Sequence, residues 1–431
     1  MEFKPEKISR RRFLKSAVAA GSLGALSIPS ASGQHSTQSV LPTPEESGID
    51  HVVLVMMENR SFDHFLGWMP GANGRQAGLR YPDFTGQLQP THHLTDFQGC
   101  AFQDPDHSYE GGRIEYDNGR CDGWLQANDM YSIGYYEQSD LAFLGAAAPS
   151  WTVCDNYFAA ILAETYPNRF YQHAAQTDRI HNVNSPSTLP TIWDRLQTAG
   201  LTGKYYFNDA PFTALWGTKY LGISRPYTEF LADCARGSLS RVSFIDPRFE
   251  DETSGTSNDD HPHADIRNGE YFLNQIYDAV TSGPKWPHTI LIINFDEWGG
   301  FFDHVPPPLG PIPEADRLAG NQDGRLGFRT PALIISPWSR RGYVSNIQFD
   351  HTSVLKLIQW RWRLAPLTVR DAAANNLALA LDFEHPNSFA PLYSVPMGPF
   401  GGVCGQSLPS TEESVWATLT SVANKLGFPL P

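Results

Sequence analysis

Six short apolar segments, separated by amphipathic ones, constrain the fold of this chain more than any other feature of the sequence. Residues 52–57 and 289–295 are the clearest, because most of their side chains are apolar and do not alternate with polar ones. Such segments are typical of strands that are buried on both faces, as in a parallel sheet. Further strands are expected at residues 151–155, 201–207, 241–245 and 332–336.

Helical patterns lie between these segments, at residues 168–176, 192–199, 265–281 and 352–362. The alternation of strand and helix predicts an α/β fold with a doubly wound, mostly parallel sheet flanked by helices. Two longer segments are rich in Gly, Pro, Asp and aromatic residues, at 70–150 and 300–330. Loops of this length inside a domain usually carry function.

The composition indicates a folded, acidic protein. Hydrophobic residues make up 41% of the 431 residues and aromatic residues 12%, which is enough to build a core and excludes wholesale disorder. Asp and Glu (46) outnumber Lys and Arg (32), so the formal net charge is −14. This balance argues against a general nucleic-acid binder, which would show a basic stripe. Beyond the N-terminus no apolar stretch reaches the ~18 residues that are needed to cross a membrane.

The N-terminus has the features of an export signal. Residues 10–15 read Arg-Arg-Arg-Phe-Leu-Lys, and a run of small and apolar residues follows over 16–28. This order is typical of a signal peptide and resembles the twin-arginine pattern. We expect a signal peptide over 1–33, a linker over 34–48 and a single domain over 49–431, exported by the twin-arginine machinery to the periplasm, the cell envelope or the outside. The alternative is a basic, disordered tail with a short buried helix.

Five cysteines are scattered along the chain, and none belongs to a Cys-x-x-Cys pair. A structural zinc site is therefore not expected. In an oxidising compartment Cys100 and Cys121 could form a disulfide across a loop, and the odd number leaves at least one thiol free.

Oxygen-bearing side chains follow the two clearest apolar segments. Glu58 and Asn59 come after the first, and Asp296 and Glu297 come after the second. In an open α/β sheet, ligands bind beyond the carboxyl ends of the strands. Four oxygen donors at one sheet edge could hold a divalent cation. The alternative is that each pair caps a following helix, but two such pairs at the same kind of position favour a metal site.

A hydroxyl precedes another expected helix. Pro167 suits a first helical turn, and Thr165 lies just before it. The unpaired N–H groups and the dipole of a helix N-terminus favour an anion such as phosphate at this point. The alternative is that Thr165 is a simple N-cap.

Histidines lie close to the acidic segments. His261 and His263 precede the helix expected at 265–281, His304 follows Asp303 in the loop after the second acidic pair, and His107 lies in the first long loop. Such side chains could donate hydrogen bonds to an anionic group or act as general acid. The context of His351 is intermediate, and the remaining histidines are expected to be structural or superficial.

Five blocks of sequence, in order over about residues 50–365, resemble the bacterial phosphoesterase family, which holds secreted phospholipases C and related acid phosphatases. The blocks are residues 51–67, 165–169, 261–266, 295–305 and 350–353. Five ordered blocks are far more specific than a single motif. The family looks like a branch of the alkaline phosphatase superfamily, and a twin-arginine signal is common in it.

The resemblance implies a site built from many of the residues singled out above. A single divalent metal (Ca, Mg, Mn or Zn) would be held by Glu58, Asn59, Asp296 and Glu297, and Thr165 would be the nucleophile that touches it. His107, His261, His263 and His304 would line the phosphoryl pocket. Some family members have only one histidine at the position of His261 and His263, so either of the two could be the family's histidine. Asn168 and Asp303 are expected to contact the substrate.

The resemblance further implies that residues 49–431 form one phosphoesterase catalytic domain, without the extra C-terminal domains of larger family members. We expect a secreted, metal-dependent phosphoric ester hydrolase of phospholipase C type that acts through a phosphothreonine intermediate. The alternatives are an acid phosphatase that cleaves phosphomonoesters and a non-catalytic secreted binding protein. A phospholipid or another phosphate ester would be the substrate, with transient contact to a membrane surface. Six aromatic side chains could rim the pocket or simply pack the loops: Trp68, Trp124, Tyr131, Tyr135, Tyr136 and Trp298.

Overall fold

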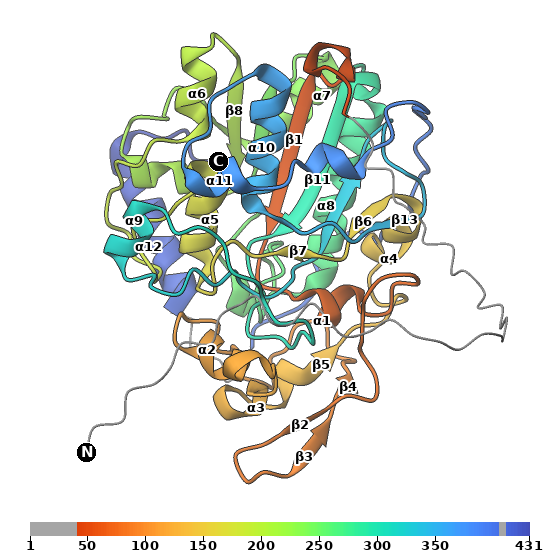
Figure 1. Cartoon of the computed structure of the whole chain (residues 1–431), viewed down its shortest axis with the longest axis vertical. Helices are drawn as coiled ribbons and strands as arrows, with labels where there is room; N and C mark the ends of the chain where they lie inside the picture. The colour runs from red at the N-terminus through yellow and green to blue at the C-terminus, as the bar shows by residue number, and fades with distance from the viewer. Residues whose placement is uncertain (1–40, 405–410) are drawn as a thin grey trace, which may run out of the picture. The chain divides into compact units, whose positions relative to one another are not determined.

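The six predicted strands all lie in one eight-stranded sheet (Figure 1). The computed structural model describes residues 41–404 and 411–431. The strand order is β13-β6-β12-β11-β1-β10-β8-β9. These strands are β1 (His51–Met57), β6 (Thr152–Cys154), β8 (Gly203–Phe207), β9 (Ser224–Pro226), β10 (Val242–Ile245), β11 (Thr289–Phe295), β12 (Ala332–Ile335) and β13 (Tyr343–Ser345). The outer strands β9 and β13 were not predicted, because three residues are too few to show a pattern.

The sheet is mostly parallel, as the sequence predicts. Strands β11, β1, β10, β8 and β9 run parallel to one another, and β13 is parallel to β6. Only β12 runs against its two neighbours, β11 and β6. The central strands β1 and β11 pair along their whole length, from His51 beside Thr289 to Met57 beside Phe295.

Helices cover both faces of this sheet, so the doubly wound prediction is confirmed. Along β1, Val52 and Leu54 point into one apolar cluster, and Val53 and Val55 point into another. The first cluster includes α5 (Thr165–Ala174), α6 (Ile192–Thr198), α10 (His351–Trp362) and α12 (Thr411–Leu426). The second includes α1 (Phe62–Leu66), α4 (Leu144–Ala147), α7 (Tyr227–Arg236) and α8 (Ile266–Ser282). The four predicted helices correspond to α5, α6, α8 and α10.

Short elements from the first long loop gather beyond the carboxyl ends of the central strands, at the bottom of Figure 1. They are β2 (Arg80–Pro82), β3 (Leu88–Pro90), β4 (His92–His93), β5 (Gly134–Tyr135), α2 (Gly111–Tyr116) and α3 (Trp124–Ala127). The remaining elements are β7 (Tyr157–Phe158), β14 (Phe349–Asp350), α9 (Glu314–Ala319) and α11 (Val369–Ala373). The long loops thus cover the edge where ligands bind in folds of this class.

The disulfide differs from the one that the sequence suggested. Cys100 is bonded to Cys404, at a sequence separation of 304, and not to Cys121. Cys121 is a buried free thiol, as are Cys154 and Cys234. Loop spacing favoured a local partner, whereas the chain fold brings the distant Cys404 beside the first long loop.

The described residues belong to one compact unit, Val40–Pro431. The predicted signal peptide (1–33) and the first part of the predicted linker lie outside the described residues. Within residues 41–404 and 411–431, no helix combines the length and the hydropathy that a membrane span requires.

Glu270 of α8 gives the fold a specific pH dependence. Its carboxylate is buried and accepts the N–H groups of Phe143 and Leu144 at 2.5 and 2.9 Å, which ties α8 to the start of α4. Burial raises the pKa of Glu270 from 4.5 to about 7. The folded protein therefore keeps a proton that the unfolded chain loses above pH ~4.5, so this group lowers the free energy of unfolding as the pH rises toward 7, by at most ~1.4 kcal/mol per pH unit.

We predict that Glu270→Gln, which mimics the protonated form, flattens the decline of unfolding free energy between pH 5 and pH 7. Urea unfolding at several pH values measures it, and Glu384→Gln on the exposed surface is the control. Other buried carboxyls contribute in the same direction. The test therefore compares the slope of unfolding free energy against pH in the variant with that in the wild type. An unchanged slope in Glu270→Gln would contradict the prediction.

Candidate active site

The register of β1 and β11 brings the two predicted acidic pairs together. Met57 and Phe295 are the last residues of the two strands and lie side by side, so the residues that follow them leave the sheet at the same point. The N–H of Asn59 donates to Asp296 Oδ1 at 3.2 Å. Glu58, Asn59, Asp296 and Glu297 are all fully buried.

Thr165 meets this group from another direction. It is the first residue of α5, and its Oγ1 donates to Asn59 Oδ1 at 3.2 Å. The side chain is fully buried. The five oxygen-bearing residues that the sequence singles out therefore lie in one place, although they come from three elements that are far apart along the chain.

The loops after β1 and β11 pack against each other at backbone distance. Asn59 adopts a left-handed conformation (φ 55°), and so does Gly299 (φ 63°). A Cβ at position 299 would lie 2.1 Å from the carbonyl oxygen of Asn59. Only glycine fits both the conformation and the space, and the Gly299 N–H donates to Glu297 Oε2 at 2.7 Å.

Arg169 links the carboxylates of three strands and was not singled out by the sequence. It lies one turn after Thr165 on α5 and is almost fully buried. Its guanidinium contacts Asp296 Oδ2 (Nε, 3.1 Å), Asp246 Oδ1 (Nη1, 3.0 Å) and Glu58 Oε1 (Nη2, 3.1 Å). Burial alone would lower the pKa of Arg169, but the three carboxylates outweigh it and raise the pKa above its ordinary value.

Aromatic rings hold Arg169 in place. Its guanidinium lies 4.7 Å from the ring of Phe249 and 5.7 Å from that of Trp416 on α12. The two rings stack on each other with centroids 3.8 Å apart. Asp246, which follows β10, was also missed, because a single acidic residue after a strand is a weak signal. Burial raises its pKa, against the effect of Arg169.

The donor set fits a hard divalent cation. Glu58, Asp246, Asp296 and Glu297 are four buried carboxylates, and Arg169 is the cationic side chain that contacts three of them. Buried carboxylates in excess of nearby cations must take up protons or a metal ion. Carboxylate, amide and hydroxyl oxygens are the ligands that Ca²⁺, Mg²⁺ and Mn²⁺ prefer, and zinc also accepts carboxylates.

Two of the four predicted histidines lie beside this group. His107 Nε2 is 3.4 Å from Asn59 Nδ2 and 3.9 Å from Glu297 Oε1, while its Nδ1 is 2.8 Å from the carbonyl of Pro105. The ring of His261 lies 5.8 Å from that of His107, edge to face, and is fully buried. His261 Nδ1 is 3.0 Å from Glu252 Oε2.

The structure places His304 and Asp303 in a different cluster. His304 Nδ1 is 2.5 Å from Asp63 Oδ2, and its Nε2 is 3.1 Å from Asn73 Oδ1. Asp303 forms two contacts of 3.0 Å with Arg329, which also contacts Asp63 at 3.1 Å. These side chains are committed to an ion network between loops, so the geometry does not support the predicted pocket role of His304 or the predicted substrate contact of Asp303.

His263 and Asn168 are likewise used by the fold. His263 Nε2 is 3.1 Å from the carbonyl of Phe102. The Asn168 amide donates to the carbonyls of Ile161, Ala163 and Glu164 and accepts the N–H of Ile161. Asn168 therefore shapes the turn that presents Thr165 and has no donor left for a substrate, which corrects the prediction.

The start of α5 offers fewer N–H groups to an anion than the sequence suggested. Pro167 has none, and the Tyr166 N–H donates to Asn182 Oδ1 at 2.7 Å. Most of the charge on a bound anion must therefore be met by other groups. His351, by contrast, has a supporting role: burial lowers its pKa to about 4, and its Nε2 lies 2.6 Å from the carbonyl of Asp296, where the neutral ring donates a hydrogen bond.

An acidic pocket of about 360 Å³ is lined by His107 and by Glu164, the residue that precedes Thr165. Its charged or titratable lining consists of Asp104, Asp106, His107, Glu164 and His181. None of the described residues that line it is Lys or Arg. The pocket therefore carries negative charge beside His107 and at the residue before Thr165.

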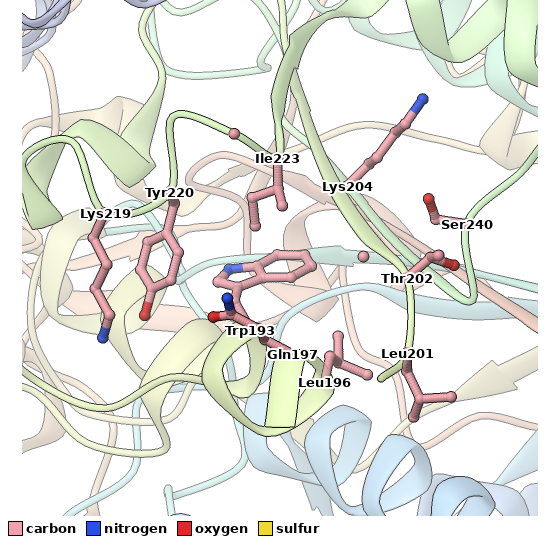
Figure 2. Close-up of a pocket in the computed structure, with 12 residues that line it drawn as sticks. Trp193, Leu196, Gln197, Leu201, Thr202, Lys204, Lys219, Tyr220, Ile223 and Ser240 are labelled. Atoms are coloured by element: carbon pink, nitrogen blue, oxygen red, sulfur yellow. The ribbon is translucent and has the colours of Figure 1, made fainter. Parts of the chain in front are cut away.

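A second cavity, of about 420 Å³, lies at the opposite end of the sheet (Figure 2). Its lining includes residues 201–203, where β8 begins, and Ser240, which precedes β10. Figure 2 shows the Trp193 ring in its middle. Lys204 and Lys219 at its rim are paired with acidic side chains, and none of the predicted site residues lines it.

The aromatic side chains expected around the pocket are mostly buried. Trp124, Tyr131, Tyr136 and Trp298 are fully buried and pack the long loops, and Tyr135 is 8% exposed. Of the two alternatives that the sequence left open, loop packing is the one that the structure shows for these five rings.

Replacing Arg169 by Met should destabilise the protein strongly. The change leaves three buried carboxylates without their shared cation, which costs ~3–5 kcal/mol for a broken buried pair. Arg363→Met is the control, since Arg363 is paired with Glu45 at the exposed surface, where solvent screens the pair and its loss should change stability little. Urea unfolding of both variants measures the difference. Similar losses in the two variants would contradict this account of Arg169.

Comparisons with known proteins identify the family of this chain. Residues 49–365 match the model of the Phosphoesterase family. A non-hemolytic phospholipase C of Pseudomonas aeruginosa is 31% identical over 457 residues, covering 88% of this chain and 64% of that protein. Phospholipase C B of Mycobacterium tuberculosis is 31% identical over 457 residues (88% and 86%), and the non-specific phospholipase C1 of Arabidopsis thaliana is 30% identical over 383 residues (77% and 71%).

Among solved structures, a protein in the alkaline phosphatase superfamily from Vibrio parahaemolyticus aligns with a TM-score of 0.37 and 9% identity, over 89% of each chain. The chain spans less than two thirds of the length of the Pseudomonas relative but more of the other two. The family model covers well over half of the chain, in the segment that contains every residue of the site except Trp416. The chain belongs to the Phosphoesterase family.

Proposed function

We propose that this protein is a phosphoric ester hydrolase of phospholipase C type, with Thr165 as its nucleophile. The observation that carries the proposal is the position of the Thr165 hydroxyl, which opens a helix and is bonded to Asn59 among the buried carboxylates. The family and the names of the relatives support the reaction class.

Thr165 Oγ would attack phosphorus in line with the ester oxygen that leaves. Thr165 Oγ gives up its proton to water, and the bond from Oγ to phosphorus forms as the bond to the leaving alcohol breaks, which gives a phosphothreonine. Water then attacks phosphorus and releases Thr165. Asn59 orients the hydroxyl by accepting its hydrogen bond, and Asn168 fixes the turn in front of it.

His107 is placed to move the proton. Its Nδ1 faces the Pro105 carbonyl and therefore carries a hydrogen, while its Nε2 faces the Asn59 amide and Glu297. When Nε2 is protonated it can give its proton to the leaving oxygen. His261, edge to face with His107 and in contact with Glu252, would position that ring.

Glu58, Asn59, Asp296 and Glu297 would hold one divalent cation (Ca, Mg, Mn or Zn). When bound, it would lower the pKa of the adjacent hydroxyl and draw charge from the phosphoryl oxygens. Arg169 keeps Glu58 and Asp296 in position and offsets part of their mutual repulsion.

The acidic pocket favours a phosphodiester with a cationic group. A phosphomonoester carries about two negative charges near neutral pH and a diester carries one, so the lining acids repel the monoester more strongly. A choline or ethanolamine head group would add attraction. This charge argument favours the phospholipase C reading over an acid phosphatase.

Contact with a lipid surface would involve the β2–β3 hairpin rather than the buried aromatic side chains. The hairpin lies among the elements beyond the carboxyl ends of the sheet (Figure 1). Phe84 at its turn is 84% exposed, and Leu88 on β3 is 53% exposed.

We also propose export from the cytoplasm, which the twin-arginine pattern and the Cys100–Cys404 disulfide support.

Thr165→Ala should lower turnover of bis(p-nitrophenyl) phosphate by ~10³-fold or more, because no other hydroxyl replaces the nucleophile. Mass spectrometry of acid-quenched wild type should show one added phosphoryl group on Thr165. Thr165→Ser, which keeps a hydroxyl, is the matched control and should retain activity and the adduct. Turnover in Thr165→Ala close to that of the wild type would exclude Thr165 as nucleophile.

The diester preference is tested by the ratio of kcat/KM values for bis(p-nitrophenyl) phosphate and p-nitrophenyl phosphate, followed by hydrolysis of phosphatidylcholine and phosphatidylglycerol vesicles. We expect the diester and the choline lipid to be preferred. A preference for the monoester would instead identify a phosphomonoesterase.

A further inference from the structure

A second group of buried carboxylates shares Glu58 with the site described above. Carboxylate oxygens of Glu58, Glu252 and Asp259 lie within 4.8 Å of one another. All three side chains are fully buried. Glu252 and Asp259 were not among the predicted site residues, because they belong to a loop whose path the sequence does not reveal.

That loop connects β10 to α8 and is fixed at its base and at β1. The N–H of Arg248 donates to Asn258 Oδ1 at 2.6 Å, and the N–H of Asn258 donates to the carbonyl of Arg248 at 3.2 Å. The N–H of Glu58 donates to the carbonyl of Asp259 at 2.8 Å. The backbone therefore holds Asp259 beside Glu58, independently of any attraction between the side chains.

Two basic side chains contact this group. His261 Nδ1 lies 3.0 Å from Glu252 Oε2, and Arg169 lies against Glu58. Arg169 contacts Glu58 but is shared with Asp246 and Asp296. Asp259 Oδ1 accepts the N–H of His261 at 3.1 Å. Asp259 Oδ2, although buried, has no hydrogen-bond partner among the described residues. A buried carboxylate oxygen in this state is costly unless a cation or proton meets it.

The cluster of Asp63, Asp303 and His304 shows that closeness of acidic side chains does not by itself indicate a metal site. Its ligand atoms also lie within 4.8 Å of one another, and its two aspartates are fully buried. There Arg329 contacts both aspartates, and all four of their oxygens accept hydrogen bonds. The two groups differ at Asp259, whose buried Oδ2 has no hydrogen-bond partner among the described residues.

We propose that Glu58, Glu252 and Asp259 hold a second divalent cation, so that Glu58 is shared between two ions. Three carboxylate ligands suit a hard ion such as Ca²⁺, Mg²⁺ or Mn²⁺. The proposal rests on the proposed function only through Glu58, the ligand common to both sites.

The stoichiometry of Mn²⁺ binding tests this proposal. The full chain is stripped of metal, dialysed against Mn²⁺ and analysed for metal content. We expect two ions per wild-type chain, one per Asp259→Asn chain and one per Asp296→Asn chain. Asp303→Asn removes a buried carboxylate from the balanced cluster and should keep two ions. Glu252→Gln gives a second variant of the new site in case Asp259→Asn does not fold.

The outcomes separate this inference from the proposed function. Paramagnetic resonance should show two coupled Mn²⁺ ions in the wild type and an isolated ion in Asp259→Asn. A wild type with one ion, or an Asp259→Asn or Glu252→Gln variant that still binds two, would overturn the second site and leave the first intact. A wild type that binds no Mn²⁺, Ca²⁺, Mg²⁺ or Zn²⁺ would overturn both.

Discussion

The structure depends on the parallel pairing of β1 and β11, which places the buried carboxylates that follow the two strands next to each other. The strands pair over their full length and end together, so Glu58 and Asp296 leave the sheet side by side. Repulsion between such groups in a buried environment would separate them if nothing opposed it. Arg169 is held by Phe249 and Trp416. It contacts both carboxylates and keeps them close together. The position of Thr165 follows, because it lies one turn before Arg169 on the same helix.

The chemistry follows from the same concentration of charge. Four buried carboxylates and one arginine repel a phosphate ester unless a cation offsets them, and the start of α5 offers few N–H groups to do so. The carboxylates that would bind the cation are the same groups that would repel the phosphate ester without it. In the proposed mechanism, catalysis therefore depends on the metal. The proposed preference for a diester with a positive charge of its own rests on the same principle, applied to the acids that line the pocket.

Much of the fold could be predicted from local patterns, and much of the site could not. The apolar segments at 52–57 and 289–295 define buried parallel strands, and the rule that ligands bind beyond strand ends then selects Glu58 and Asp296. Pairings across the chain carry no local signal, which is why Arg169, Asp246 and the Cys100–Cys404 bond were missed. His107 and His304 look alike in sequence, yet one faces the site and the other is bound to Asp63. Aromatic residues in the loops were equally ambiguous, because the sequence looks the same whether they line the rim of a pocket or pack inside the loops.

The most direct test of the central claim is anomalous X-ray diffraction from crystals of the protein grown with Mn²⁺. The account predicts an anomalous peak within coordination distance of oxygens from Glu58, Asn59, Asp296 and Glu297, with Thr165 Oγ beside it. Well-ordered density for these side chains without a peak among them, or with Thr165 turned away from it, would contradict the account.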